Sequence, residues 1–506
     1  MTGNAILALL PLIISGGAAV LIMVVISFIR SHRLALALTL IALAAAFASL
    51  WLTGGAATGQ VTGLLIVDGY SRFFMGLFFA AAFTIALLSY GYLARRAGPR
   101  EEYYVLLLLA TFGAAVLAAS SHFASFFLGL EILSVSLYAL IAYTRASRFS
   151  VEAAIKYLVL AGASSAFLLF GMALVYSQAG SMQFSAMANL RSQAGTAGEP
   201  VLLAGMAMLI VGFGFKLAVV PFHLWTPDVY EGAPAPVTAF VATVSKGGMF
   251  ALLLRYFIAV DVRAFPSLFV VFALIAVASM LAGNLLALLQ NNVKRVLAYS
   301  SIAHLGYLLV AFLAAGPAAG AAGRGAGTAQ AGTAQAGTAQ AGIVAVTFYL
   351  TAYFVTTLAA FGVMTVLSTG ERDLDGITDY RGLYWRRPWS AGILTVALFS
   401  LAGLPLTAGF VGKFYIITAA IGSALWFLVI ILVIGSAIGL YYYLRIMVTM
   451  FMQAEVSEAG QLPPAAAPSL SWAGEIALAA LLLAILWLGI YPGPLINLIQ
   501  AAAGRL

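Results

Sequence analysis

The 506-residue chain contains no cysteine. It therefore has no disulfide, no thiolate metal site and no iron–sulfur cluster of its own. Its four histidines (His32, His122, His223 and His304) show no metal-ligand spacing. The Gly-Lys pair at 412–413 is followed by phenylalanine and lacks the upstream glycine of a phosphate-binding loop, and no Ser/His/Asp grouping can be placed together. These absences exclude the common cofactor-binding motifs.

Charge is also scarce, since 8% of the residues are charged and 63% are hydrophobic. A membrane-spanning helix needs about 20 consecutive apolar residues. A β-barrel would instead need alternating strands of about 10 residues, whereas runs such as 105–119 and 478–490 are unbroken. The sequence predicts an all-α polytopic membrane protein without a large soluble domain. Its fourteen expected spans are 4–29, 34–53, 69–93, 103–119, 122–143, 155–178, 201–222, 236–258, 267–290, 296–315, 343–367, 389–420, 424–450 and 472–492.

The basic residues predict the topology. The first apolar run has no basic residue before it and is too long for the apolar core of a signal peptide, so it predicts a spanning helix with its N-terminus outside. Alternating from there places Arg72, Arg191, Arg255, Arg263, Arg324 and Arg505 on the outer side. A larger set falls on the inner side, as the positive-inside rule requires, so the net charge of +8 implies no nucleic-acid partner. This inner set is Arg30, Arg33, Arg95, Arg96, Arg100, Arg145, Arg148, Lys156, Lys294, Arg295, Arg372, Arg381, Arg386, Arg387 and Arg445.

Two polar stretches interrupt the apolar pattern. Residues 316–342 are rich in Gly, Ala, Thr and Gln and repeat Ala-Gly-Thr-Ala-Gln three times. This composition predicts a flexible loop, tolerated as an insertion or used as a contact surface. Residues 371–387 mix both signs of charge on the expected inner side, which indicates a solvated loop or one that meets a partner subunit.

Two of the expected helices contain internal breakers. Pro221 lies near the end of 201–222, where it cannot donate a backbone hydrogen bond. Gly403, Pro405, Gly409 and Gly412 lie close together within 389–420. Broken backbone at membrane depth is tolerated only where protein or a water-filled cavity satisfies it. A pair of interrupted helices in two halves of a chain points to an inverted-repeat transport architecture.

Four ionisable residues lie inside apolar segments, namely Glu131, Lys216, Lys246 and Lys413. A charge at bilayer depth costs roughly 2.5–3.5 kcal/mol on insertion scales, so these residues suggest a route for protons or ions. Glu131 is expected about 12 Å deep, too deep for its short side chain to reach the surface. It is either a static hydrogen-bonding or ion-pairing group or the partner of a buried lysine that it holds protonated.

The three lysines differ in their surroundings. Lys246 lies mid-span, and a lysine removed from water exchanges its proton more readily than an exposed one. A static buried amine is the alternative. Lys216 lies beside the first break and close to polar residues, so it can instead be a structural lysine that reaches the surface. Lys413 lies within the second break and has the same structural alternative, because the second half of its helix is short.

Other polar residues give weaker signals. A single helical histidine such as His304 is most often a hydrogen-bonded core residue, and a water-linked relay between the two lysine-bearing halves is the second interpretation. Asp228 and Glu231 are expected in a loop and helix cap and not at a proton site.

Several motifs together resemble the antiporter-like membrane subunits of respiratory complex I, over about residues 100–450. They are LEILS (130–134), EAAIKY (152–157), PFHLWTPD (221–228), PAPVT (234–238), NVKRVLAYSS (292–301) and GFVGKF (409–414). The resemblance implies two inverted five-helix repeats, helices 4–8 and 9–13, each with a discontinuous helix. It also implies that Glu131 and Lys216 form a modulating pair, that Lys246 is the central relay and that Lys413 is the terminal site toward the outside. The insertion at 316–342 departs from the family pattern.

The resemblance predicts how the chain is divided and what it does. Helices 1–3 would occupy residues 1–100, the first repeat 101–260, the second repeat 261–452 with the loop 316–342, and the last helix 453–506. The chain would pump protons in the bacterial inner membrane, with both termini periplasmic and other membrane-arm subunits as partners. FMN, iron–sulfur clusters and quinone would be bound by other subunits. A cation/proton antiporter subunit, Mrp-like or hydrogenase-related, remains open, as does a scaffold with static buried charges.

Overall fold

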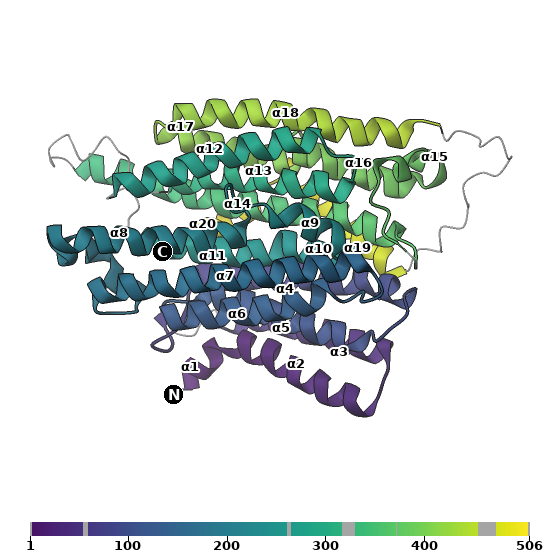
Figure 1. The fold of residues 1–506 in the computed structure, drawn as a ribbon, viewed down its shortest axis with the longest axis horizontal. Helices are drawn as coiled ribbons and strands as arrows, with labels where there is room; N and C mark the ends of the chain where they lie inside the picture. Colours follow the sequence, from purple (N-terminus) through teal and green to yellow (C-terminus); the bar gives the residue numbers. More distant parts are fainter. Residues whose placement is uncertain are drawn as a thin grey trace.

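Long helices that run side by side make up this computed structural model (Figure 1), which describes residues 3–53, 59–260, 265–315, 329–370, 372–453 and 472–503. Thirteen helices in these ranges are long and apolar enough to cross a membrane. Two shorter apolar helices, α16 (Pro388–Ala402) and α17 (Ala408–Gly422), follow one another as the halves of a further span. The predicted all-α membrane fold with about fourteen spans is therefore confirmed.

The N-terminal part begins along one edge of the bundle with α1 and α2 and reaches the interior with α4 (Figure 1). Its helices are α1 (Gly3–Ala8), α2 (Leu10–Phe28), α3 (His32–Leu52) and α4 (Gly69–Ala94). Between α3 and α4, β1 (Gly59–Gln60) pairs antiparallel with β2 (Ile66–Val67). Asp68 begins α4 as its N-cap, because its carboxylate accepts a hydrogen bond of 2.8 Å from the backbone N–H of Ser71.

Two five-helix repeats follow, as predicted. The first begins with α5 (Glu101–Ala119), α6 (Phe123–Ile141) and α7 (Arg148–Ala179). Its fourth helix is broken into α8 (Leu190–Leu217) and α9 (Trp225–Gly232). Its fifth is a continuous span made of α10 (Ala235–Phe240), the π-helix η3 (Val241–Ser245) and α11 (Lys246–Val260). A short 3-10 helix, η2 (Phe184–Asn189), precedes α8. The second comprises α12 (Pro266–Leu288), α13 (Val293–Ala314), α14 (Ala329–Leu367), the broken pair α16 and α17, and α18 (Trp426–Phe451).

The repeats pack their first two helices in the same way. In the first repeat, a Cβ atom on Gly113 of α5 would lie 2.6 Å from the backbone nitrogen of Leu133 in α6. In the second, a Cβ on Gly283 of α12 would lie 2.7 Å from the backbone nitrogen of Ala303 in α13. Each pair can therefore approach this closely only because a glycine faces the neighbouring helix. The exact domain boundaries at 100, 260 and 452 stay predictions.

Three features differ from the sequence-based expectation. The structure extends α14 back to Ala329, so 329–342 is helical and not a loop, in keeping with the high helix propensity of alanine and glutamine. Residues 316–328 lie outside the described ranges. Asp228 and Glu231 lie within α9 and not in a loop. The last span, α19 (Trp472–Ile490), is followed by a further helix, α20 (Gly493–Ala503), which was not predicted.

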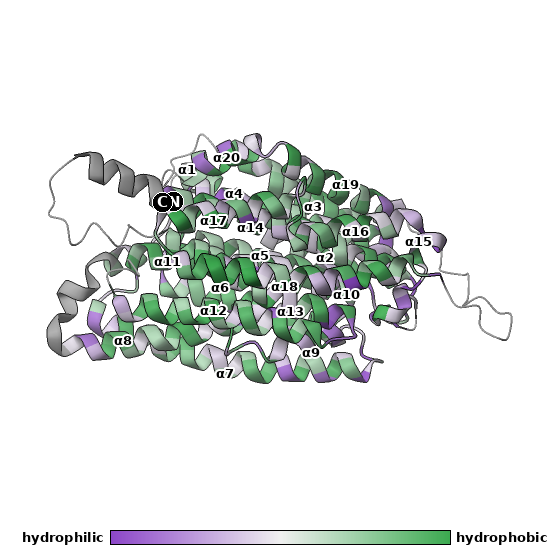
Figure 2. Cartoon of the chain, turned by 90° about the horizontal axis from the view of Figure 1, so that it is seen from above, coloured by the Kyte–Doolittle hydropathy of each residue, from purple (hydrophilic) through white to green (hydrophobic). Residues whose placement is uncertain are grey.

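The core lies along the middle of the bundle. The continuous span formed by α10, η3 and α11 is buried throughout, and α13 and α14 are nearly so, whereas only about a third of α2 and of α7 is buried. Hydropathy follows the same plan, because apolar residues fill the lengths of the helices and polar ones gather at one end, around α9, α10 and α15 (Leu383–Arg386) (Figure 2). The 3-10 helix η5 (Ile377–Tyr380) leads into α15.

Candidate functional site

Lys216 lies in the last turn of α8, directly before the break in that helix. Ala218 adopts a left-handed backbone conformation (φ 60°) and ends the helix. The amine of Lys216 donates to the hydroxyl of Ser134 and to that of Tyr157, both at 2.9 Å, and the side chain is buried. A cation is favoured at this helix end, because the C-terminal carbonyls carry partial negative charge.

Glu131 lies near Lys216 but does not pair with it directly. Its carboxylate accepts a hydrogen bond of 2.7 Å from Ser165 of α7. Among the described residues, no ion pair joins Glu131 to Lys216. Glu131 and Ser134 are three residues apart in α6, so they share one face of that helix. The serine bound to Lys216 is therefore one turn from the carboxylate, and the predicted pair is adjacent without being in contact.

Lys246 begins α11 at the junction with the π-helix η3, in the most buried span of the protein. Its amine donates to the hydroxyl of Ser301 in α13 at 2.5 Å and lies 5.4 Å from the centre of the Tyr230 ring. The Tyr230 hydroxyl is 3.2 Å from the same serine oxygen. π-Helical turns inside α-helices are frequent at functional sites.

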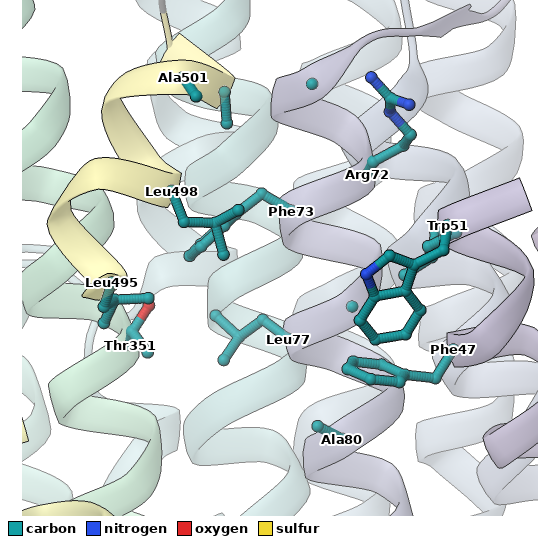
Figure 3. A pocket seen from close by; sticks show the side chains of 14 residues that line it. Phe47, Trp51, Arg72, Phe73, Leu77, Ala80, Thr351, Leu495, Leu498 and Ala501 are labelled. Carbon is teal, nitrogen blue, oxygen red and sulfur yellow. The ribbon is translucent and has the colours of Figure 1, made fainter. Parts of the chain in front are cut away.

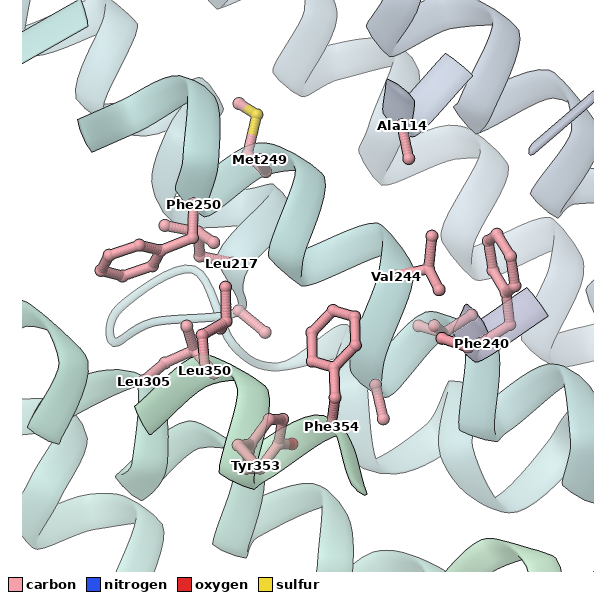
Figure 4. Close-up of a cluster of buried hydrophobic side chains, with 14 of the residues drawn as sticks. Ala114, Leu217, Phe240, Val244, Met249, Phe250, Leu305, Leu350, Tyr353 and Phe354 are labelled. Atoms are coloured by element: carbon pink, nitrogen blue, oxygen red, sulfur yellow. The ribbon is translucent and has the colours of Figure 1, made fainter. Parts of the chain in front are cut away.

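The span that carries Lys246 is enclosed by apolar side chains from both repeats (Figure 4). Around Phe240, Val244, Met249 and Phe250 of this span are gathered side chains from four other helices. These are Ala114 of α5, Leu217 of α8, Leu305 of α13, and Leu350, Tyr353 and Phe354 of α14. Such a shell excludes lipid from the amine, so hydroxyl groups provide its polar surroundings.

Lys413 lies in α17, about one and a half turns beyond the second break and not within it. Its amine nevertheless reaches back to that break, where it donates to the carbonyls of Leu401 at 3.0 Å and Ala402 at 2.8 Å. A third bond of 2.8 Å goes to Ser436 of α18. These carbonyls end α16, so Lys413 binds the C-terminus of a half-helix.

His304 lies between the sites of Lys246 and Lys413 and is buried. Its Nδ1 is 2.6 Å from the hydroxyl of Tyr349, and its Nε2 is 3.2 Å from that of Tyr443. Tyr443 in turn contacts the hydroxyl of Ser300. The sequence did not predict these serine and tyrosine partners of the lysines and of His304. Serine and tyrosine occur throughout the spans, and nothing in their spacing distinguishes these positions.

One face of α13 joins these sites. Ser301, His304 and Tyr307 follow one another at three-residue intervals, so they line the same side of the helix. Ser301 binds the amine of Lys246, and the ring of Tyr307 lies 5.4 Å from the amine of Lys413. The structure therefore places His304 between the two lysines along a single buried polar face.

A separate charged cluster lies at the end of the bundle where α9 and α10 meet. Asp228 accepts from Lys156 at 2.7 Å and from Arg295 at 2.9 Å, and Arg295 also binds Glu231 at 2.8 Å. Partial burial opposes ionisation of Asp228, but the hydrogen bonds from Lys156 and Arg295 outweigh it and hold the pKa of this carboxyl below its ordinary value. These surface ion pairs tie α7, α9 and α13 together.

Asp373 forms the buried part of this charged region. It accepts from Lys294 at 2.5 Å, Arg96 at 2.6 Å, Tyr92 at 2.8 Å and the backbone N–H of Ala235 at 3.1 Å. Nothing in the sequence indicated this role, since Asp373 belongs to a stretch expected to be a solvated loop or one that meets a partner subunit. No group of His, Cys, Asp or Glu residues suited to a metal ion occurs in the ranges that the structure describes.

Comparison with known proteins shows what this arrangement belongs to. The family described as NADH:quinone oxidoreductase/Mrp antiporter, transmembrane, matches residues 120–323 and 327–439. The NADH-quinone oxidoreductase subunit N of Nitrosospira multiformis is 51% identical over 514 residues, covering 99% of this chain and 97% of that protein. The chain belongs to the subunit N family.

Solved structures agree with this assignment. A chain in the structure of respiratory complex I from Thermus thermophilus with bound aureothin is 32% identical, with a TM-score of 0.77 over 97% of this chain and 100% of that one. A chain of the Mrp complex from Dietzia sp. shares the fold with a TM-score of 0.80 over 100% of this chain and 98% of that one, at 22% identity. The stretch WTPDVYEG (225–232), which becomes α9, predicts subunit N from the sequence alone.

Membership of the subunit N family confirms the predicted resemblance and the antiporter-like membrane fold. It also confirms the assignment to a proton-translocating NADH–quinone oxidoreductase, in which this chain is a membrane-arm subunit. The roles of Glu131, Lys216, Lys246, Lys413 and His304 stay predictions, because the comparisons identify the family and not the function of each residue.

Proposed function

We propose that this chain moves protons through its buried lysines while quinone is reduced elsewhere in NADH–quinone oxidoreductase. The observation that carries the proposal is the polar face of α13, on which Ser301, His304 and Tyr307 lie between the amines of Lys246 and Lys413. A buried ionisable group in a membrane span is costly, and here three amines are held by neutral oxygen acceptors.

The proposed sequence begins at the first break. A change transmitted from the quinone site alters how strongly Glu131 acts on the amine of Lys216, with Ser134 lying between them. The protonation state of Lys216 then changes the proton affinity of Lys246 through Coulomb repulsion in a medium of low dielectric constant. Lys246 passes its proton along the α13 face by way of His304, and Lys413 releases it.

Replacing Lys246 by alanine in the assembled complex tests this sequence. Proton pumping coupled to quinone reduction should be abolished or fall strongly, measured in inverted membrane vesicles with a pH-sensitive dye. Lys156→Ala is the matched control, because Lys156 lies at the surface in an ion pair and should leave pumping unchanged. Full activity of Lys246→Ala with normal proton stoichiometry would refute the proposal.

A cation/proton antiporter subunit of an Mrp-like or hydrogenase-related complex is the second candidate, favoured by the family description, which includes Mrp antiporters. Vesicles that contain only this chain separate the two. Robust sodium/proton exchange would support the antiporter, and its absence together with the Lys246→Ala phenotype would support the complex I subunit. If Glu131→Ala loses assembly on native gels instead of turnover, the buried charges are structural.

We also propose the surroundings implied by the family. FMN, the iron–sulfur clusters and quinone would be bound by other subunits, with which this chain assembles in the bacterial inner membrane. Both termini would lie on the periplasmic side. Because the chain has no native cysteine, a single cysteine introduced at Thr2 or Arg505 can be labelled in intact cells. Both should react with a membrane-impermeant maleimide, and labelling only after the cells are opened would reverse the topology.

A further inference from the structure

A groove of about 480 Å³ opens at the surface of the bundle between α3, α4, α14 and α20 (Figure 3). This volume lies within the range of small-molecule sites. It is separate from the lysine sites, and its walls are apolar except for Arg72 and Thr351. The other lining residues are Phe47, Leu50, Trp51, Gly69, Phe73, Gly76, Leu77, Ala80, Leu495, Leu498, Ala501 and Ala502.

Two glycines of α4 shape the groove. At Gly69, a Cβ atom would lie 3.0 Å from the Cα of Ala502, so the absence of a side chain lets α20 close one end. At Gly76, a Cβ would lie 3.2 Å from the Cδ1 of Leu50, so a side chain there would occupy the space between α3 and α4. The hollow is thus built into the packing of these helices.

Arg72 brings an uncompensated positive charge to the end of the groove. Its Nε donates to the backbone carbonyl of Asp68 at 3.3 Å, and its two terminal nitrogens donate to no group in the described part of the chain. The carboxylate of Asp68 is already engaged by Arg255, with two bonds of 2.9 Å. The guanidinium of Arg72 therefore has free donors in the fork geometry that suits phosphate.

The length of the groove matches one leaflet of a bilayer. From Arg72 to Ala80, α4 advances about 12 Å, whereas half of a typical hydrocarbon core is about 15 Å. Trp51 lies on the wall near Arg72 (Figure 3) and is 70% exposed. Tryptophan is enriched where lipid headgroups begin, so the Arg72 end corresponds to headgroup level and the Ala80 end to the bilayer interior.

We propose that this groove binds one anionic glycerophospholipid, with its phosphate on Arg72 and one acyl chain along α4 toward Ala80. The apolar walls accommodate the chain, and the free donors of Arg72 recognise the headgroup. A helix from a neighbouring subunit is about 10–12 Å wide and would bring an anion to Arg72 only through an acidic side chain, whereas every phospholipid carries a phosphate. The site is independent of the proposed proton path.

Native mass spectrometry of the purified full chain tests the assignment, with dioleoyl phosphatidylglycerol and dioleoyl phosphatidylcholine as probes. The unaltered chain should retain one phosphatidylglycerol in preference to phosphatidylcholine. Arg72→Gln should weaken phosphatidylglycerol binding by at least about tenfold, the size of a lost charge-assisted hydrogen bond. Ala80→Phe should block binding of both lipids by filling the deep end.

Two matched controls have the same chemistry outside the groove. Arg33→Gln removes an exposed arginine, and Ala45→Phe adds a ring at an exposed position of α3 on the side away from Phe47 and Trp51. Both should bind phosphatidylglycerol as the unaltered chain does. Equal binding of the two lipids, or unchanged affinity in Arg72→Gln, would overturn the headgroup assignment. Normal binding in Ala80→Phe would overturn the placement of the acyl chain.

Fluorescence gives a second measurement that leaves Arg72 and Ala80 unaltered. Phosphatidylglycerol brominated on its acyl chain should quench Trp51, one of the seven tryptophans of the chain. The quenchable signal should therefore be smaller in Trp51→Phe than in the unaltered chain. Identical quenching of the two proteins would overturn the proposal.

Discussion

Replacing Asp373 by alanine should destabilise the end of the bundle around α9 and α10 more than any surface substitution. Its carboxylate receives four donors from three different regions, α4 with its following loop, the start of α10, and α13. Lys294 also donates to the carbonyls of Glu231 and Ala233, where α9 ends, at 3.3 Å and 2.8 Å. Asp373 therefore helps to hold the second half of the first broken helix in place.

The magnitude follows from the burial of Lys294, which is 1% exposed. Removing one partner of a buried ion pair costs about 3–5 kcal/mol, because it leaves the other charge uncompensated. Asp373→Ala should lose this amount in thermal or denaturant unfolding of the purified full chain. The double variant Asp373→Leu with Lys294→Met should lose clearly less, since it removes the buried Lys294 amine as well and leaves only the Arg96 guanidinium without its carboxylate. A loss below about 1 kcal/mol for Asp373→Ala, or strict additivity of the two sites, would refute this reasoning.

The same carboxylate predicts a pH dependence. Burial opposes its ionisation, but Lys294 and Arg96 outweigh burial and hold the pKa of Asp373 below its ordinary value of 3.8. A carboxyl with a depressed pKa in the folded state stabilises the protein above its unfolded pKa and loses that contribution as the pH falls through the folded pKa. The stability gap between the unaltered chain and Asp373→Asn should therefore be full above about pH 5 and shrink below about pH 4. A gap that stays constant down to pH 2 would contradict this assignment.

Three further substitutions test other parts of the structure. Ser301→Ala removes the acceptor of the Lys246 amine and should slow proton pumping by about tenfold in vesicles, whereas Ser301→Thr should retain most of it. Gly113→Leu should abolish stable assembly on native gels, because its Cβ would lie 2.6 Å from the backbone of α6, whereas Gly392→Leu, which faces open space, should assemble normally. Arg255→Met should cost about 3–5 kcal/mol in thermal unfolding by leaving the buried carboxylate of Asp68 unpaired, and Arg255→Lys should recover part of that loss because it keeps the charge.

The sequence was sufficient to predict the spans and the two breaks. Bilayer thickness sets a minimum length of apolar sequence, and a buried backbone group must find a partner, so both features are local in the chain. Pro221 and the cluster from Gly403 to Gly412 accordingly predicted breaks that the structure shows at the ends of α8 and α16. The free-energy cost of burying a charge likewise identified Glu131 and the three lysines as candidate site residues.

The contacts of those residues could not be predicted, because they depend on how each helix is rotated and packed. Ser134, Tyr157 and Ser301 have the same sequence surroundings as many other hydroxyl residues in the spans, yet among the residues that the structure describes they are the hydroxyl groups that accept from the amines of Lys216 and Lys246. Lys413 was expected inside its break but lies in the following helix and reaches back to the carbonyls. The pattern of apolar residues predicts which segments form spanning helices, whereas the hydrogen-bond partners of each lysine are decided by tertiary packing.

The acceptors of the three lysines suit the proposed role of these buried amines in carrying protons. Lys216 and Lys246 donate to hydroxyl groups, and Lys413 donates to two carbonyls and a hydroxyl. If each amine were paired with a carboxylate, removing its proton would leave an uncompensated buried anion, at a cost of several kcal/mol. With neutral acceptors, deprotonation leaves no charge behind.

The broken helices contribute to this arrangement. The end of α16 exposes the carbonyls that bind Lys413, and Lys216 stands at the C-terminus of α8. A helix that continued through either point would use those carbonyls in its own hydrogen bonds. The only carboxylate expected near the path, that of Glu131, is bound to Ser165 and lies one turn from the serine that holds Lys216. In this position it can tune the charge of an amine without trapping the proton in a permanent ion pair.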